Sequence, residues 1–242
     1  MKITWLGHSA FKLEESTGTT VVTDPYHSYI GYKMPRVTAD IVTVSHGHND
    51  HNNLPAVLGD PEVISAAGAY DISGVHILAR RTFHDSKNGA ARGENLVFKF
   101  RMDGVDICHM GDIGEECNAM LVDSIAPVNV LMIPVGGTYT IDAEQAKEFV
   151  DRIMPDVVIP MHYKTRDCSM DISRLNEFLD LLTDEQRDAI EVVTADGARW
   201  IADAVAERLP RAELAVDPFH AVSWATEALD ALDSQIICGG VA

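Results

Sequence analysis

The chain has 242 residues, of which 46% are hydrophobic, so it can bury one large α/β core or two small ones. Its 19 Lys and Arg against 37 Asp and Glu give a formal net charge of -18, which repels nucleic-acid phosphates and anionic membrane surfaces. The sequence has no apolar leader and no run of about 18 apolar residues, so it predicts neither secretion nor a membrane span.

Short β-branched runs recur along the first two thirds of the chain, and runs of this kind predict strands. They are KITWLG, AFKLEE, TTVVTD, IVTVS, EVISA, HILA, LVFKF, VDICHM, VLMIPV and VVIPM. Asp103-Gly104 separates two of them and supplies the positive φ angles of a tight turn, which predicts an antiparallel hairpin.

Helical patterns alternate with these runs. DAEQAKEFVDRIM opens with Asp142 as an N-cap, and Gln145 follows at the spacing of a capping box. A second pattern, DISRLNEFLDLL, comes after the last run. The mixture predicts sheets covered by helices.

The cysteines show neither CxxC spacing nor the density of a disulfide-bonded scaffold. They are Cys108, Cys117, Cys168 and Cys238. This pattern is typical of reduced thiols, and we expect a cytoplasmic protein without nucleic-acid or membrane partners. Formation of a homo-oligomer is left open by the sequence.

The segment SHGHNDH, residues 45–51, follows the apolar run ADIVTV directly. His46 and His48 are two residues apart, so in extended backbone they point to the same side and can share one cation. Asp50 and His51 stand where the chain turns and can face a second cation. Imidazole and carboxylate suit Zn, Mn, Fe or Ni. Any one of these residues alone could be a solvated loop residue, but their density after a buried strand favours a metal site.

Three further candidate ligands stand at other strand ends. His84 follows HILA, Asp112 follows the second hairpin strand, and His162 follows VVIP. Each alone could be an ordinary core or surface residue, since strand ends carry many polar residues. Asp112 is suited to a bridging position because the two oxygens of a carboxylate can hold cations roughly 3.5–4 Å apart.

Taken in order, these motifs resemble the metallo-β-lactamase superfamily, whose signature is His-x-His-x-Asp-His followed by a separate His, an Asp and a final His. The sequence is most similar to small metal-dependent hydrolases related to ascorbate-6-phosphate lactonase, on the phrases WLGHSAF, TDPY, ICHMGDIG and PVGGTYTIDAEQA. The resemblance covers about residues 1 to 180. It implies an α/β fold, a four-layer αββα sandwich with the site at one edge of the two sheets.

The resemblance also implies a ligand set. It assigns His46, His48 and His84 to a first metal, Asp50, His51 and His162 to a second, and Asp112 to the bridge between them.

Three other residues near the motifs are candidates for the surroundings of the site. Asp24 in TDPY resembles the family's early aspartate that supports the site, although a turn residue before Pro25 is the alternative. His8 in GHSAF matches a motif of the related hydrolases and is expected to face the substrate or a metal. His109 is interpreted as a satisfied core histidine.

The implied function is that of a metal-dependent hydrolase. Two divalent cations lower the pKa of a shared water from about 15.7 toward about 7, and the metal-bridging hydroxide attacks an ester, lactone or phosphoester bond of a small anionic substrate. Asp50 is expected to orient the hydroxide and accept a proton. A catalytically silent metal-binding or regulatory protein is the alternative, and a nuclease is less favoured because it needs a basic track.

Two segments are candidates for contacting the substrate. Gly136 and Gly137 in PVGGTYT allow close approach of the chain, and their N–H groups are candidates for binding an anion; an ordinary flexible loop is the alternative. Lys164, with Tyr163 and Arg166, follows His162 and is a candidate for holding a phosphate or carboxylate, or a solvated loop residue.

From about Leu179 onward the sequence departs from the small hydrolases and resembles an internal piece of insertion-sequence transposases, through DPFH and WATEALD. Asp217 matches one catalytic carboxylate of that family, but the other carboxylates are missing, so transposition is not implied. We predict a hydrolase domain at residues 1–182 and a helical extension at 183–242. Apolar residues recur with helical spacing over about 217–233, which predicts a docked amphipathic helix that does not take part in metal binding.

Overall fold

The computed structural model describes residues 1–188, 192–195, 206–207 and 210–216. The chain divides into two compact units, Met1–Leu181 and Leu182–Ala242, and each is described by itself. The helix predicted over 217–233, with Asp217, lies outside the described residues. The division into a hydrolase domain and a docked extension therefore stays a prediction.

The first sheet of the Met1–Leu181 unit has five strands in the order β1-β2-β3-β5-β7. Strands β1, β2 and β3 pair antiparallel, whereas β5 and β7 add in parallel. The bounds are β1 (Lys2–Gly7), β2 (Ala10–Glu14), β3 (Thr20–Thr23), β5 (Ile41–Thr43) and β7 (Glu62–Ile64). A separate pair, β4 (Val37–Thr38) and β6 (Val57–Leu58), is also parallel.

The second sheet has six strands in the order β13-β12-β11-β10-β9-β8. Its bounds are β8 (Gly68–Ile72), β9 (Val75–Phe83), β10 (Glu94–Met102), β11 (Val105–His109), β12 (Val130–Pro134) and β13 (Val157–Met161). The predicted hairpin is confirmed: Met102 pairs with Val105, and both Asp103 and Gly104 have positive φ angles, 47° and 76°. Strands β11, β12 and β13 pair in parallel.

The helices of this unit are α1 (Ala119–Ile125), α2 (Ala143–Ile153) and α3 (Leu175–Asp180), with 3-10 turns η1 (Ser28–Ile30) and η2 (Leu54–Ala56). The predicted capping box of α2 is confirmed, because Asp142 accepts from Gln145 N–H and the Gln145 side chain accepts from Asp142 N–H. The second helical pattern is shorter than predicted and gives only α3.

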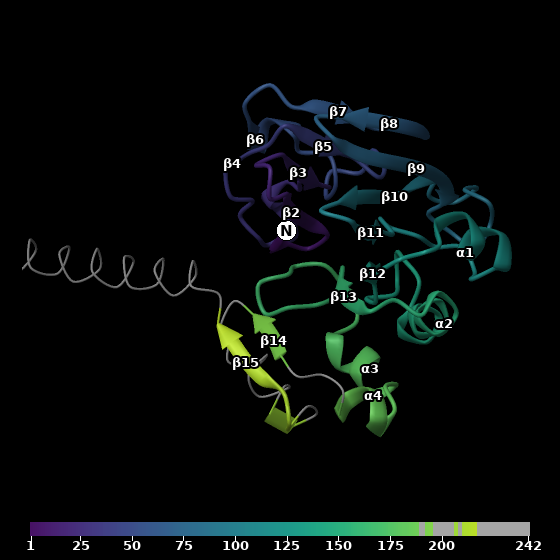
Figure 1. Cartoon of the computed structure of the whole chain (residues 1–242). Helices are drawn as coiled ribbons and strands as arrows, with labels where there is room; N and C mark the ends of the chain where they lie inside the picture. The colour runs from purple at the N-terminus through teal and green to yellow at the C-terminus, as the bar shows by residue number, and fades with distance from the viewer. Residues whose placement is uncertain (189–191, 196–205, 208–209, 217–242) are drawn as a thin grey trace, which may run out of the picture. The chain divides into compact units, whose positions relative to one another are not determined.

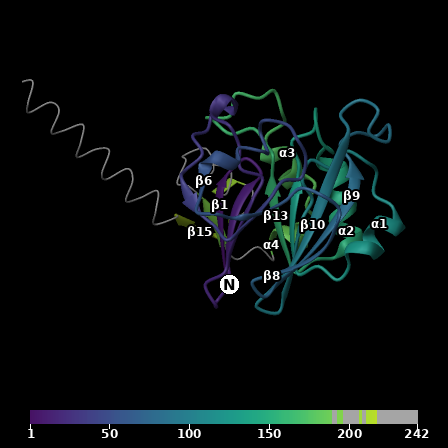
Figure 2. The same cartoon turned by 90° about the horizontal axis from the view of Figure 1, so that it is seen from above.

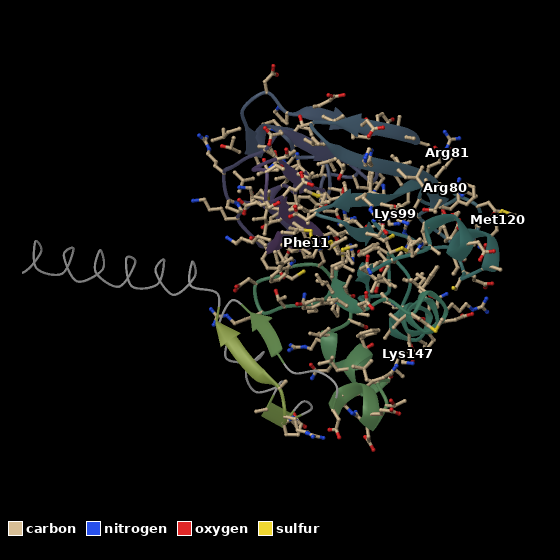
Figure 3. All side chains as sticks on the ribbon, viewed as in Figure 1. Phe11, Arg80, Arg81, Lys99, Met120 and Lys147 are labelled. Atoms are coloured by element: carbon tan, nitrogen blue, oxygen red, sulfur yellow. The ribbon has the colours of Figure 1, made fainter. Side chains whose placement is uncertain are left out.

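A core of apolar side chains joins the two sheets face to face. Phe11 and Ile41 from the first sheet pack in one cluster with Phe98, Phe100 and Met132 from the second. Figure 3 shows Phe11 inside this layer. Each fully buried side chain of this size contributes about 1.5–3 kcal/mol, so this cluster is the main reason that the sheets stay docked.

The outer faces of the two sheets are covered differently. Helix α2 packs on β12 of the second sheet and buries Ala143, Ala146 and Phe149, and α1 contacts α2 (Figures 1 and 2). On the first sheet a second apolar cluster includes Tyr26 and Ile30, and short turns cover it in place of long helices. The predicted layered α/β sandwich is confirmed, with this thinner first layer.

The Leu182–Ala242 unit contains α4 (Asp184–Asp188) and a parallel pair, β14 (Val192–Ala195) with β15 (Glu213–Val216). Arg211 forms an ion pair with Asp188, 2.7 Å between Nη1 and Oδ2. None of the helices in the described part of the chain is long and apolar enough to cross a membrane.

Candidate metal centre

The predicted ligands follow strands of both sheets. His8 comes directly after β1, His46 to His51 after β5, His84 after β9, Asp112 after β11 and His162 after β13. The structure brings them together as three overlapping groups, in each of which the ligand atoms lie within 4.8 Å of one another. The groups are His46, His48 and His84; His8, Asp50, His51 and His162; and His46, His51 and Asp112.

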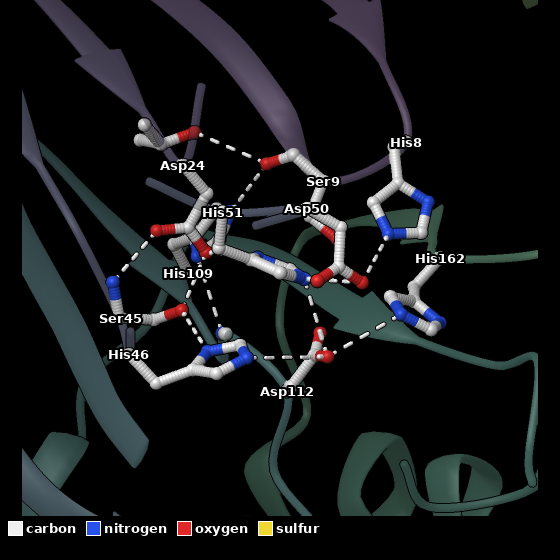
Figure 4. Close-up of polar contacts among 12 residues, drawn as sticks. His8, Ser9, Asp24, Ser45, His46, Asp50, His51, His109, Asp112 and His162 are labelled. Carbon is white, nitrogen blue, oxygen red and sulfur yellow. Dashed lines mark hydrogen bonds and ion pairs between the residues drawn. The ribbon is translucent and has the colours of Figure 1, made fainter. Parts of the chain in front are cut away.

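Asp112 lies at the centre of these groups (Figure 4). Its Oδ2 is close to the Nε2 atom of four imidazoles: 3.2 Å from His51, 3.3 Å from His162, 3.6 Å from His84 and 3.8 Å from His46. The side chain is almost completely buried, at 1% exposure. One carboxylate therefore faces both halves of the predicted ligand set, which is the position a bridging ligand requires.

Several buried polar atoms of the site have no hydrogen-bond partner among the described residues. They are Nδ1 and Nε2 of His8, Nε2 of His46, Nε2 of His51, Nδ1 of His84, Oδ1 of Asp112, and Nδ1 and Nε2 of His162. Each such atom costs about 1–3 kcal/mol if it stays unsatisfied. Because these are nitrogen and oxygen donors that converge on one place, the residues fit divalent transition metals.

Asp24 supports two of the imidazoles. Its Oδ2 lies 2.9 Å from His51 Nδ1 and accepts a hydrogen bond from Ser45 Oγ at 2.6 Å, while its Oδ1 accepts from Ser45 N–H at 2.7 Å. Ser45 Oγ in turn lies 2.9 Å from His46 Nδ1. With Nδ1 held in this way, His51 and His46 both direct Nε2 towards Asp112.

The Asp24 contact predicts the effect of Asp24→Asn. The new Nδ2 donor would face His51 Nδ1 and force the ring proton onto Nε2, the atom needed for a metal. We expect an affinity for Zn about 10- to 100-fold lower, the usual cost of losing such a support, measured by competition with a chromogenic chelator. Asp40→Asn, at an exposed aspartate that accepts from Thr20, is the matched control; equal affinity in the two variants would contradict the role of Asp24.

Three residues of the site have a strained backbone. His8, Asp24 and His162 have positive φ angles of 53°, 40° and 52°. Residues other than glycine rarely adopt this region, and at functional sites it costs about 1–3 kcal/mol each. At His8 and His162 the turn comes directly after a strand end, so the two imidazole rings lie 4.2 Å apart between centroids.

Two buried polar residues fix the loop that carries Asp112. Asn95 Oδ1 accepts from Asp112 N–H at 2.9 Å, and its Nδ2 donates to Met110 O and Thr82 Oγ1. His109 donates from Nε2 to Ser9 O and accepts at Nδ1 from Gly111 N–H. His109 is thus a satisfied buried histidine. Asn95 was missed from the sequence, because a single amide in a strand has no distinguishing pattern.

The protonation states of the imidazoles depend on their burial and on the carboxylates of Asp112 and Asp24. Burial, with His162 nearby, lowers the pKa of His8 to about 4, and burial with His51 nearby lowers that of His46 to about 3. For His51 burial acts in the same direction, but Asp112 and Asp24 outweigh it and raise its pKa well above the usual range. His8 and His46 are therefore neutral imidazoles near pH 7, the form that can bind a metal, whereas His51 carries a proton.

The residues predicted to contact the substrate make other contacts within the chain. Gly136 has no room for a side chain, because a Cβ would stand 2.1 Å from His162 O, and the N–H of Gly137 donates to Ile141 O within the loop. Lys164 Nζ donates to Met170 O, while the Tyr163 ring stacks on Trp5. Arg166 pairs with Asp167.

A hollow of about 650 Å³ lies over the predicted ligands. Its lining is Tyr29, His48, Asn49, Asp50, His84, Arg92, Asp112, Tyr139, Ser169, Met170 and Asp171. Lys164 does not line it. Tyr29, Arg92 and Tyr139 were not singled out from the sequence, because they come from loops distant from the histidine motif. Burial and the adjacent Asp50 carboxylate, to which it hydrogen bonds, raise the pKa of Tyr29.

Comparison with known proteins places most of the chain in a family. Residues 2–162 match the family model of the beta-lactamase superfamily domain, and residues 169–237 match a transposase family model. A UPF0173 metal-dependent hydrolase of Carboxydothermus hydrogenoformans is 31% identical over 194 residues, covering 68% of this chain and 85% of that protein. The corresponding protein of Pelotomaculum thermopropionicum is 30% identical over 197 residues, with the same coverage of 68% and 85%.

Solved structures show the same fold. A Thermotoga maritima protein assigned as a Zn-dependent hydrolase of the metallo-beta-lactamase superfamily is 38% identical, with a TM-score of 0.66 over 88% of this chain and 96% of that one. Igni18, a metallo hydrolase of Ignicoccus hospitalis, has a TM-score of 0.56 at 22% identity, covering 89% of this chain and 94% of that one, and shows the likeness of fold alone.

Proposed function

Because the chain belongs to the beta-lactamase superfamily and is a metal-dependent hydrolase, we propose that it uses two divalent cations to cleave an ester, lactone or phosphoester bond of a small anionic substrate. The observation that carries this proposal is the convergence of His46, His51, His84 and His162 on one buried carboxylate oxygen of Asp112. Buried nitrogen and oxygen atoms without a hydrogen-bond partner lie beside an open hollow, and this arrangement supports a reaction centre at that place.

In this proposal the two halves of the ligand set hold one cation each. His46, His48 and His84 would hold the first, Asp50, His51 and His162 would hold the second, and Asp112 would be shared by both. When bound, divalent cations lower the pKa of water toward about 7 and polarise the oxygen of the scissile group. Zn, Mn, Fe and Ni all suit these ligands.

Asp50 and Tyr29 have roles at the wall of the hollow. Asp50 Oδ2 lies 3.6 Å from His8 Nε2 and 3.7 Å from His51 Nε2, and the carboxylate faces the hollow, so it can orient the attacking water and accept its proton. The Tyr29 hydroxyl hydrogen bonds to the Asp50 carboxylate, so it is proposed to help orient Asp50 at the wall of the hollow. His8 faces the second half of the ligand set and is proposed to hold Asp50 in place.

The test combines metal analysis with an activity panel. We expect about two equivalents of transition metal per chain in protein purified without added metal, and hydrolysis of at least one member of a panel of esters, lactones and phosphodiesters. Full metal content without turnover on any of them would favour the catalytically silent alternative. Lactonase specificity, the choice of metal, a cytoplasmic location and the absence of a nucleic-acid partner remain predictions.

The protonated state of His51 makes metal binding depend on pH. Its raised pKa means that the proton is held through neutral pH, and a cation at Nε2 must displace it, so the apparent affinity for Zn falls as the pH falls. We expect release of about one proton when metal-free protein is titrated with Zn at about pH 7. Calorimetry in buffers of different ionisation enthalpy measures this release, and heats that are independent of the buffer would contradict it.

A further inference from the structure

A second hollow of about 410 Å³ adjoins the hollow over the predicted ligands, because Arg92 and Tyr139 line both. These two side chains therefore stand where the two spaces meet. The second hollow is also lined by Lys87 and by the hydroxyl-bearing Ser86 and Thr140. A substrate longer than its reacting group can therefore extend from the metal centre past Arg92.

Arg92 is held at this boundary by three contacts. Its backbone N–H donates to Asp85 Oδ2 at 2.7 Å, and its Nη2 donates to Thr138 O at 2.9 Å. Its guanidinium carbon lies 5.6 Å from the centroid of the Tyr139 ring. No carboxylate forms an ion pair with Arg92 in the part of the chain that the structure describes, so several of its five N–H donors remain available for a ligand.

Asp85 is the acidic group of the second hollow, and it is already satisfied. Its two oxygens accept four backbone N–H groups, from Lys87 and Gly89 at Oδ1 and from Ala91 and Arg92 at Oδ2. Burial opposes ionisation of Asp85, but these donors outweigh it and lower its pKa to about 2. Asp85 thus organises the loop that positions Lys87 and Arg92, and its charge is met by the backbone and not by their side chains.

We propose that Arg92, assisted by Lys87, binds an oxyanion group of the substrate, a carboxylate or phosphate remote from the bond that is cleaved. The planar guanidinium matches either group with two parallel hydrogen bonds. In a chain with a formal net charge of -18, two cationic side chains that line the second hollow select locally for an anion that the rest of the surface repels. This inference rests on the proposed hydrolysis and names the class of substrate.

Two esters that differ by one terminal carboxylate test the proposal: p-nitrophenyl butyrate, which is neutral, and mono-p-nitrophenyl glutarate, which carries the same chain with a carboxylate added at its end. The measurement is the ratio of kcat/KM for the glutarate ester to that for the butyrate ester in the metal-loaded protein. We expect Arg92→Gln to lower this ratio by about 10- to 100-fold, as for loss of a charge-assisted hydrogen bond. Lys87→Gln should lower it in the same direction by less.

Arg80→Gln is the matched control, because Arg80 is an exposed arginine on β9 that does not line either hollow (Figure 3). It removes the same net charge and should leave the ratio unchanged. An equal ratio in the wild type and both Arg92→Gln and Lys87→Gln would overturn the proposal, as would an equal fall in Arg80→Gln.

Titration with inorganic phosphate separates this inference from the proposed function. We expect the metal-loaded protein to bind phosphate at least about tenfold more weakly in Arg92→Gln than in Arg80→Gln. If neither ester is hydrolysed, the proposed ester hydrolysis fails and this titration alone decides the inference; equal phosphate affinities overturn it. Weaker phosphate binding with an unchanged ester ratio would assign the site to free phosphate and overturn the substrate assignment.

Discussion

Replacement of Asp112 by Ala is expected to abolish hydrolysis and to lower the metal content to one equivalent or less. The variant loses the oxygen that four imidazoles face and the negative charge that offsets two cations. A fall in kcat/KM of at least about 1,000-fold, or about 4 kcal/mol of transition-state stabilisation, is the expected size. Elemental analysis and the rate on the best substrate of the panel measure the two effects.

The control for Asp112→Ala is Asp123→Ala, at an exposed aspartate of α1 outside the site. Asp112→Asn adds a second comparison, because it keeps the shape of the side chain and removes only its charge. Circular dichroism is the check that each variant is folded. Two bound metals and normal turnover in folded Asp112→Ala would contradict the bridging assignment.

The second large effect is expected from two substitutions, each of which should empty a different one of the two metal positions. His84→Ala should empty the position formed with His46 and His48, whereas His162→Ala should empty the one formed with Asp50 and His51. Each variant is expected to keep about one equivalent of metal, because the other half of the ligand set stays intact. Crystals of each variant, with anomalous difference maps recorded at the absorption edge of the metal, locate the ion that remains.

The comparison of the two variants with each other is its own control. Each loses one imidazole and one potential donor, so a general loss of stability would reduce both positions in both variants. Maps in which both substitutions empty the same position would refute the assignment of ligands to halves.

The predicted ligands could be read from the sequence because they stand at the ends of buried strands. The pattern of HGHNDH places four donors on one short turn, and the strand ends before His84, Asp112 and His162 meet at the same edge once the two sheets pack. Local spacing and strand alternation therefore identify these side chains as candidates, whereas their assignment to two metals came from the family resemblance.

The substrate side of the site could not be read in the same way. Lys164 follows His162 in the chain, but the positive φ angle of His162 turns the backbone, and Lys164 bonds to Met170 O instead of facing the hollow. Arg92 and Tyr29 reach the hollow through loops whose course depends on tertiary contacts, such as the four N–H groups that Asp85 collects. Sequence adjacency carries no information about such contacts.

The ligands of the predicted metal centre come from both sheets, so the centre connects the two sheets at this edge. His46 and His51 follow a strand of the first sheet, and Asp112 and His162 follow strands of the second, so bound cations tie the two sheets together at this edge. Saturation at about 100 times the dissociation constant would add about 2.7 kcal/mol to the stability of the docked state. The same side chains thus serve both catalysis and the docking of the two sheets. A variant that loses one of them is expected to lose stability as well as hydrolytic activity.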